Sequence, residues 1–203
     1  MDWKSLLSNH SKDINQHNIL NTNAETGEKA SLFLKNKAVC TQESGYILVE
    51  GPDAEVFLQG QVTCDVSNVV QGASVNGAHL NPQGKVIFSF LLSKLKKGLI
   101  ILDVNKPILA TAMSSLEKYA VFSKVTLSLS ENFYSFLISS KASDDLPKLT
   151  EYSSIQKLSK GIIYSIVPKT LFSKWFDLIK DDIMLIHNDI SRCIRINAGL
   201  TDI

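Results

Sequence analysis

The stretch GPDAEVFLQGQVTCDV, residues 51–66, decides the fold assignment. A β-rich run from Tyr46 to Glu50 precedes it, and the pair Gly51-Pro52 is typical of a turn that ends a strand. Asp53 is then expected to cap a helix whose apolar residues recur at helical spacing: Ala54, Phe57, Leu58 and Val62. The polar residues of this helix, Glu55, Gln59 and Gln61, are predicted to face outward.

Further strands and helices alternate on the C-terminal side of this stretch. The tetrad Asn81-Pro82-Gln83-Gly84 predicts a turn between extended runs at 73–80 and 86–92, which together make a β-hairpin. The apolar patterning predicts later strands at 99–104, 121–129, 133–138 and 161–167, helices at 107–119 and 171–179, and short strand-like runs at 184–186 and 190–196. The expected fold class is therefore α+β, with small sheets covered by helices on one face, rather than a doubly wound parallel sheet.

Composition restricts the class of protein. The 203 residues are 44% hydrophobic and 20% charged, as expected for a globular chain, and 21 Lys and Arg against 20 Asp and Glu give a net charge of +1. This balance does not favour direct nucleic-acid binding, and no long apolar run indicates a membrane span. The start of the chain does not resemble a secretory signal, so a cytoplasmic protein is expected.

Few residues form a pattern typical of catalysis or of metal binding. Cys40, Cys64 and Cys193 stand far apart, which disfavours a metal site or a disulfide framework, and each is expected to be a small buried hydrophobe. No G-x-S-x-G motif accompanies His79, and the tripeptide His187-Asn188-Asp189 is explained equally well by a turn. No catalytic residue and no metal ligand are assigned.

Four polar residues lie at the end of the first predicted helix, and the helical spacing of its apolar residues does not account for them. They are Gln59, Gln61, Thr63 and Asp65. Such a group is suited to hydrogen-bond a planar heterocycle, but helix capping by Thr63 and Asp65 explains it equally well. The residues alone leave both interpretations open.

Four segments resemble elements of the YgfZ and aminomethyltransferase superfamily of folate-binding proteins. The stretch at 51–66 is similar to the signature that opens the family's folate-binding domain, and LNPQGKV at 80–86 resembles the family's hairpin with its G-K step. The segment LEKYAVFSKV at 116–125 is similar to the YgfZ element K-Y-x-x-x-S-K-V, and RINAG at 195–199 to R-I-x-A-G. The segments follow the family's order and spacing, and they cover roughly residues 45–203.

The resemblance implies two interleaved ferredoxin-like lobes around a central folate cavity. Residues 1–30 are expected to be a polar lead-in with a short helix, and 31–203 the folate-binding domain. Lobe one is expected to combine about 31–52 with 126–203, and lobe two to comprise about 53–125. The C-terminal β-barrel of the family is expected to be absent from this chain. The chain stops before the family's K-G-C-Y-x-G-Q-E motif, which suggests a fragment or a shortened homologue, and Cys193 does not replace that motif's cysteine.

The functional expectations also follow from the resemblance. It implies a tetrahydrofolate-binding accessory protein that supports assembly or repair of iron–sulfur enzymes and thereby tRNA modification. An acidic residue works beside the folate in aminomethyltransferases, but Phe88 and Ser89 occupy the corresponding region, so aminomethyl transfer is not expected. The alternatives are a folate-dependent one-carbon transferase that uses another acid, such as Asp65 or Asp103, and a folate-independent protein-interaction module.

Five residues are expected to contact folate if the family's cavity is retained. Tyr46 is the aromatic residue nearest to one of the positions where family members carry a Trp that can stack on the pterin. Gln61 and Asp65 are expected to supply polar contacts, and Lys85 or Lys124 to hold the glutamate tail.

Overall fold

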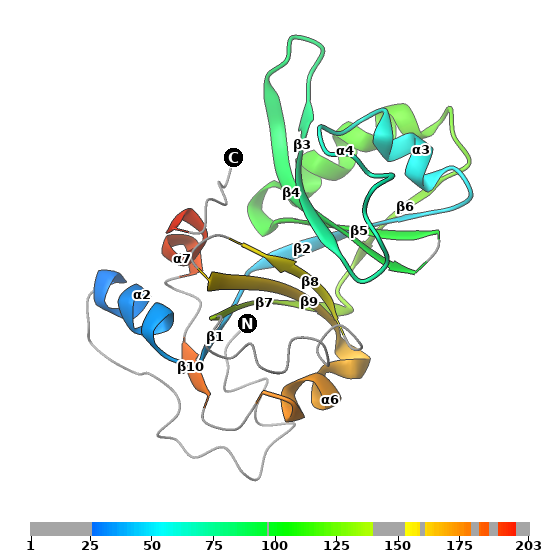
Figure 1. Cartoon of the computed structure of the whole chain (residues 1–203). Coiled ribbons are helices and arrows are strands. Elements are labelled where there is room, and N and C mark those ends of the chain that lie inside the picture. Colours follow the sequence, from blue (N-terminus) through cyan, green and yellow to red (C-terminus); the bar gives the residue numbers. More distant parts are fainter. Residues whose placement is uncertain are drawn as a thin grey trace. The chain divides into compact units, whose positions relative to one another are not determined.

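The computed structural model describes residues 26–96, 98–139, 153–158, 161–179, 183–186 and 191–197 (Figure 1). Their strands form two five-stranded sheets, and the chain divides into two compact units. Unit 1 combines the described residues up to Glu43 with those from Tyr134 onward, and unit 2 is the continuous segment Ser44–Phe133. The expected α+β class is confirmed, and neither sheet closes into a barrel within the part of the chain that the structure describes.

Unit 2 is an antiparallel sheet with its strands in the order β3-β4-β5-β2-β6. Its elements along the chain are β2 (Ser44–Glu50), α3 (Ala54–Gln59), β3 (Ser74–Leu80), β4 (Val86–Lys96), β5 (Leu99–Asn105), a 3-10 turn (Lys106–Ile108), α4 (Leu109–Ala120) and β6 (Thr126–Ser130). A register shift interrupts the β3–β4 pairing next to the hairpin turn, where Ile87 has no opposing residue. The predicted hairpin and the strands before and after it are confirmed.

One face of the unit 2 sheet carries the hydrophobic core. Every second residue of the three central strands points into it, and α3 and α4 cover it with residues such as Phe57, Leu58 and Leu116. The sheet residues are Ile47, Val49, Phe88, Phe90, Leu92, Ile100, Leu102 and Val104. Burying each large apolar side chain contributes about 1.5–3 kcal/mol, so this face is the main source of stability in unit 2.

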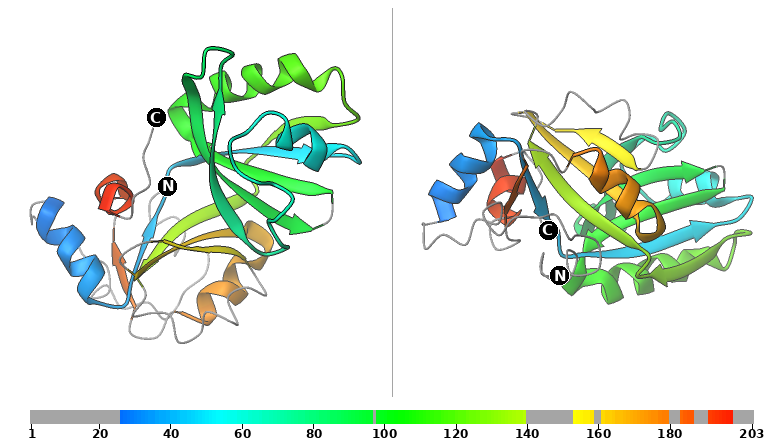
Figure 2. Two further views of the ribbon diagram at one scale, coloured as in Figure 1. Left: turned by 45° about the horizontal axis from the view of Figure 1, so that its top comes forward. Right: turned by 90° about the horizontal axis from the view of Figure 1, so that it is seen from below.

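Unit 1 has the strand order β10-β1-β7-β9-β8, with β1 parallel to β10 and antiparallel to β7 (Figure 2). Its elements are α2 (Thr26–Lys35), β1 (Ala38–Thr41), β7 (Phe133–Ser139), β8 (Ser154–Lys157), β9 (Ile162–Pro168), a 3-10 turn (Lys169–Leu171), α6 (Phe172–Asp177), β10 (Met184–Ile186) and α7 (Ser191–Asn197). Stacked rings fill its core, and the centroids of Phe136 and Trp175 lie 4.5 Å apart.

Several sequence-based expectations need correction. The predicted strand at 121–129 is wrong in its first half, because residues 121–125 form the turn that follows α4. The strand-like run at 190–196 is wrong, because α7 is a helix. The elements α2, β1 and β8 were not predicted, and most of the expected lead-in lies outside the described residues. β2 and β6 pair inside unit 2, and the expected lobe boundaries stay a prediction.

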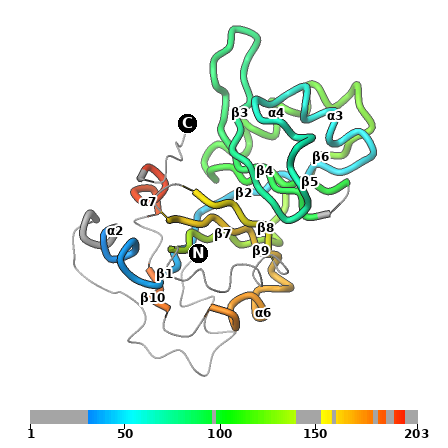
Figure 3. The backbone as a smooth tube through the Cα atoms, in the orientation of Figure 1, coloured from blue at the N-terminus to red at the C-terminus, as the bar shows by residue number. Residues whose placement is uncertain are grey.

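A long-range hydrogen bond joins the start of α3 to the turn after α4. The path of the backbone through α3 and α4 can be followed in Figure 3. Asp53 occupies the N-cap position of α3, but its side chain makes no capping hydrogen bond, contrary to expectation. Instead its carboxylate accepts the backbone N–H of Lys124 at 2.8 Å. Gly51 has a φ of +124° and lies so close to the carbonyl oxygen of Lys124 that a Cβ there would collide with it. The family-like stretches at 51–66 and 116–125 are therefore in direct contact.

Replacing Gly51 with Ala should destabilise unit 2 substantially. The left-handed conformation alone costs about 1–3 kcal/mol for a residue with a Cβ, and the collision with Lys124 adds to it. Gly84→Ala is the matched control, because Gly84 has a φ of +79° and open space around it. Urea denaturation should show the larger loss for Gly51→Ala, and equal losses would refute the close approach.

Candidate functional site

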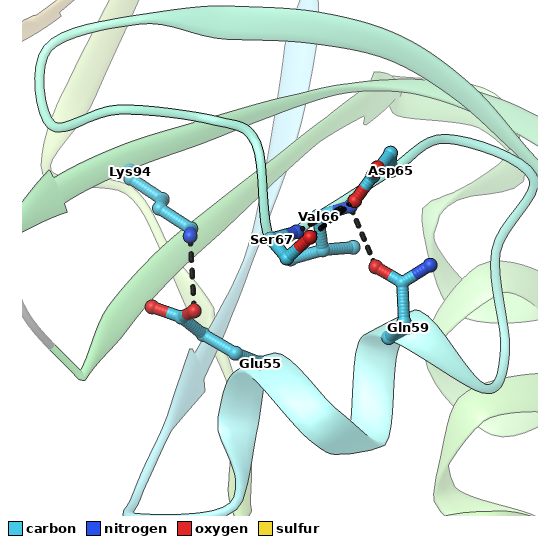
Figure 4. Close-up of polar contacts among 6 residues, drawn as sticks. All are labelled: Glu55, Gln59, Asp65, Val66, Ser67 and Lys94. Carbon is cyan, nitrogen blue, oxygen red and sulfur yellow. Dashed lines mark hydrogen bonds and ion pairs between the residues drawn. The ribbon is translucent and has the colours of Figure 1, made fainter.

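The polar residues that follow α3 mostly bond to one another and to the neighbouring backbone. The Gln59 side-chain oxygen accepts the backbone N–H of Val66 at 2.8 Å, and Val66 itself is fully buried (Figure 4). Glu55 pairs with Lys94 of β4 at 3.0 Å. Glu55 and Gln59 are exposed, as predicted, and both also tie α3 to its surroundings.

The segment after α3 continues as a partner of β3. Thr63 donates its N–H to the Ala78 carbonyl and accepts the Ala78 N–H on its hydroxyl, each at 3.0 Å, and Val62 forms a β-bridge with His79. Cys64 packs against β3, where a Cβ on Gly77 would come within 2.8 Å of the Cys64 sulfur. Burial raises the pKa of the Cys64 thiol, so it remains protonated at neutral pH.

Asp65 closes a tight turn on the surface. One carboxylate oxygen accepts both the N–H and the hydroxyl of Ser67, and the other accepts the side-chain amide of Asn68. The bond from the Ser67 hydroxyl is the main cause that lowers the pKa of Asp65, because it stabilises the ionised carboxylate. Helix-end and turn capping thus account for much of the polar cluster around Asp65.

His79 is a buried polar residue with one unsatisfied nitrogen. Its side chain is 2% exposed, and Nδ1 lies 2.7 Å from the Gln61 carbonyl oxygen. A carbonyl only accepts hydrogen bonds, so Nδ1 is assigned the proton. Nε2 has no hydrogen-bond partner among the described residues, and the nearby rings are those of Phe88 and Tyr119.

The face of the unit 2 sheet opposite the core carries a row of mostly polar residues. Direct strand pairing aligns Asn76, Leu91, Asp103, Tyr46 and Ser130 across all five strands. Paired residues of antiparallel strands share a face, and the residues beside this row point into the core. Asp103 and Tyr46 are neighbours in the row and are 4% and 5% exposed. The row therefore places a buried carboxylate beside a tyrosine.

A second row on the same face is also polar. It aligns Ser74, Ser93, Ile101, Leu48 and Ser128. The hydroxyl oxygens of Ser74 and Ser93 lie 2.6 Å apart, which agrees with adjacent positions on one face. Sequence analysis did not detect either row, because only the pairing register shows which residues align.

The five expected folate contacts all belong to unit 2 but do not form one cluster. Tyr46 lies in the polar row, with its ring 5.5 Å from that of Phe133. Gln61 lies beside His79, and Asp65 lies in its own turn. Lys85 and Lys124 are exposed, the first at the end of the hairpin turn and the second in the turn after α4.

Other candidates from the sequence receive little support from the described residues. The tripeptide at 187–189 and the last two residues of the RINAG segment lie outside them. Within the described ranges, no group of His, Cys, Asp and Glu could hold a metal ion, and no helix has the length and apolarity needed to cross a membrane. Cys40 and Cys64 are buried as expected, and Cys193 is half-buried.

Comparison with known proteins supports the resemblance seen in the sequence. No family model matches the chain. A tRNA-modifying protein YgfZ from Aliivibrio fischeri is 31% identical over 136 residues, which are 67% of this chain and 42% of that protein. The chain is a relative of the YgfZ proteins. An uncharacterised protein of Haemophilus influenzae is 45% identical over 83 residues, 41% of this chain and 30% of that protein. The matched regions therefore span less than half of these relatives.

The fold has a counterpart among solved structures. The aminomethyltransferase of the glycine cleavage system from Bartonella henselae superimposes with a TM-score of 0.68 and 16% identity, over 87% of this chain and 55% of that protein. This similarity confirms the expected aminomethyltransferase-like fold. At this identity it says nothing about activity.

The hydrogen bond between Gln59 and Val66 should be needed for stability. Gln59→Ala leaves the N–H of Val66 without its acceptor and should cost about 1–3 kcal/mol, whereas Gln59→Glu keeps an acceptor oxygen and should cost less. Urea denaturation of both variants measures the difference. Equal stability of Gln59→Ala and the parent chain would show that the bond is unimportant.

The Asp65 turn should weaken in acid. A carboxyl whose pKa is lowered by folding stabilises the folded state above its unfolded pKa, and this contribution is lost as the pH falls through the folded pKa. NMR titration of the Asp65 carboxyl carbon should give a midpoint below 3.8. Ser67→Ala should raise that midpoint, and an unchanged midpoint would contradict the assigned cause.

Proposed function

We propose that this chain is a cytoplasmic, tetrahydrofolate-binding accessory protein that supports assembly or repair of iron–sulfur enzymes and thereby tRNA modification. The observation that carries the proposal is the 31% identity over 136 residues to a protein named as the tRNA-modifying protein YgfZ. The aminomethyltransferase-like fold supports the folate part of the proposal. The iron–sulfur enzymes are proposed as partners of this chain, as its resemblance to the YgfZ proteins implies.

The polar rows of the unit 2 sheet supply chemistry that suits a pterin. A pterin is flat and carries hydrogen-bond donors and acceptors along its edge, so it requires an aromatic surface and polar groups in one plane. We propose Tyr46 for the ring and the neighbouring Asp103 carboxylate as an acceptor for an amino group. Gln61 and Asp65 are proposed as further polar contacts, and the exposed Lys85 and Lys124 as cations for the glutamate tail.

The hairpin supports a binding role rather than catalysis of aminomethyl transfer. Phe88, in the region where aminomethyltransferases carry their acid, is fully buried in the core. Ser89 alternates to the opposite face and carries no charge. Neither side chain can stabilise a developing cationic amine.

One observation favours the alternative of a one-carbon transferase. Asp103 is a buried carboxylate beside Tyr46 on the polar face, which is the kind of setting in which catalytic acids occur. Asp65 suits this role less well, since it lies in an exposed turn and not on the polar face. Asp103 is therefore the acid on which this alternative depends.

Isothermal titration of the whole chain with tetrahydrofolate tests the proposal. The parent chain should bind, and Tyr46→Ala should weaken binding about ten-fold or more, because the loss of one stacked ring costs roughly 1.4 kcal/mol. Tyr46→Phe keeps the ring and should bind nearly as well as the parent. Asp65→Ala should weaken binding if its turn borders the ligand.

Leu129→Ala is the matched control, because Leu129 is an exposed residue of the same sheet that lies opposite Ile47, on the core side. It should leave the affinity unchanged, and circular dichroism should show that every variant is folded. An absence of binding by the parent chain would overturn the folate assignment and favour a folate-independent interaction module. Equal affinities of Tyr46→Ala and the parent would place the ligand away from the polar face.

A further inference from the structure

The unit 2 sheet ends in two edge strands, β3 and β6, and the chain itself covers the β3 edge. Val62 forms a β-bridge with His79 of this strand. Thr63 exchanges two further hydrogen bonds with Ala78, and a register shift interrupts the pairing of β3 near its end. Covering segments and irregular pairing are devices by which proteins prevent a sheet edge from binding another strand. Within the described residues, β6 has neither.

The outer edge of β6 is regular and uncharged. The strand pairs with β2 without a register shift, and its sequence, TLSLS, contains no Pro and no charged residue. No backbone hydrogen bond joins this outer edge to another described residue. Leu129 of β6 is 55% exposed, although it lies on the core side of the sheet opposite Ile47. Such an edge can accept a further strand through backbone hydrogen bonds.

The sequence of β6 complements itself when a second copy of the chain pairs with this edge in the antiparallel direction. The register in which all five residues pair places Ser128 opposite Ser128 of the second copy. The same register places Leu127 opposite Leu129, and Thr126 opposite Ser130, in both directions. Opposite residues of antiparallel strands share a face, so the two Leu pairs lie together on the core side. The exposed Leu129 is thereby covered by an apolar side chain.

Opposite charges at the two ends of β6 favour the same arrangement. Lys124 precedes the strand and Glu131 follows it, and both are exposed. Neither makes an ion pair with a described residue, because Asp53 accepts the backbone N–H of Lys124 and not its ammonium group. Antiparallel pairing brings the start of each strand to the end of the other, so each Lys124 lies near Glu131 of the second copy. Parallel pairing in register would instead bring like charges together.

We propose that this chain forms a two-fold symmetric dimer in which the β6 edges of two copies pair in the antiparallel direction, with Ser128 at the axis. The pairing joins two unit 2 sheets edge to edge and uses neither face of the sheet. It therefore does not depend on tetrahydrofolate. An edge of five residues is a small interface, so the dimer is expected to be weak and to depend on protein concentration.

Sedimentation equilibrium of the whole chain without folate, from about 1 µM to about 1 mM, should show a reversible monomer–dimer equilibrium. Lys124→Glu and Glu131→Lys each create two like-charge contacts in the dimer, and each should raise its dissociation constant about ten-fold at low salt. An equimolar mixture of the two variants restores both contacts in a mixed dimer, which should form as readily as the parent dimer. A variant that had merely unfolded could not be rescued in this way.

Disulfide crosslinking tests the register of the pairing. Two copies of Ser128→Cys bring their sulfur atoms together at the axis, so mild oxidation should give a covalent dimer on a non-reducing gel. Thr126→Cys is the matched control on the same strand, because its two copies lie about 13 Å apart along the strands and cannot be bridged. Both variants also carry Cys193→Ser, since Cys193 is half-buried whereas the other two cysteines are buried.

Three results would overturn the proposal. The first is a parent chain that stays monomeric over the whole concentration range, which would leave the β6 edge to a strand of another protein. The others are a mixture of the charge variants that associates no better than either alone, and Ser128→Cys that crosslinks no faster than Thr126→Cys. If tetrahydrofolate binding fails while the dimer is confirmed, only the folate proposal is lost.

Discussion

The hydrogen bond from the Lys124 backbone to the Asp53 carboxylate is the constraint on which the arrangement of unit 2 depends. It joins residues 71 positions apart, at the start of one helix and just after the end of the other. The close approach of Gly51 to the same peptide group reinforces it. β6 begins two residues after this contact. The contact therefore fixes the place where β6 enters the sheet, and with it the alignment of Ser130 with Tyr46.

This constraint also explains what the sequence could and could not predict. The strands β2, β4 and β5 were recognisable because each alternates or runs apolar over several residues, which is a local signal. Residues 121–125 carry the same alternation but form a turn, because a contact with Asp53 holds them there and no local pattern shows that contact. The run at 190–196 was wrongly predicted as strand-like, because short apolar runs fit a helix and a strand equally well.

The candidate site was predictable in its residues more than in their roles. The polar cluster around Gln59 and Thr63 stood out in the sequence, yet the structure satisfies most of its hydrogen bonds internally. Tyr46 was selected as an aromatic residue, but its neighbours Asp103 and Ser130 are defined only by strand register. A one-residue change in register would turn a whole strand to its other face, so this information belongs to the assembled sheet.

The division of the chain has a consequence for the order in which the protein folds during synthesis. All strands of unit 2 lie in one continuous segment, whereas β1 of unit 1 leaves the ribosome long before its neighbours β7 and β10 exist. The Tyr46 and Phe133 rings, near the two ends of unit 2, lie 5.5 Å apart. Once unit 2 has folded, it keeps the end of β1 close to the start of β7. Pairing of these two strands then no longer costs most of the entropy of closing the long segment between them. The inserted unit is therefore expected to assist the folding of the unit that surrounds it in sequence.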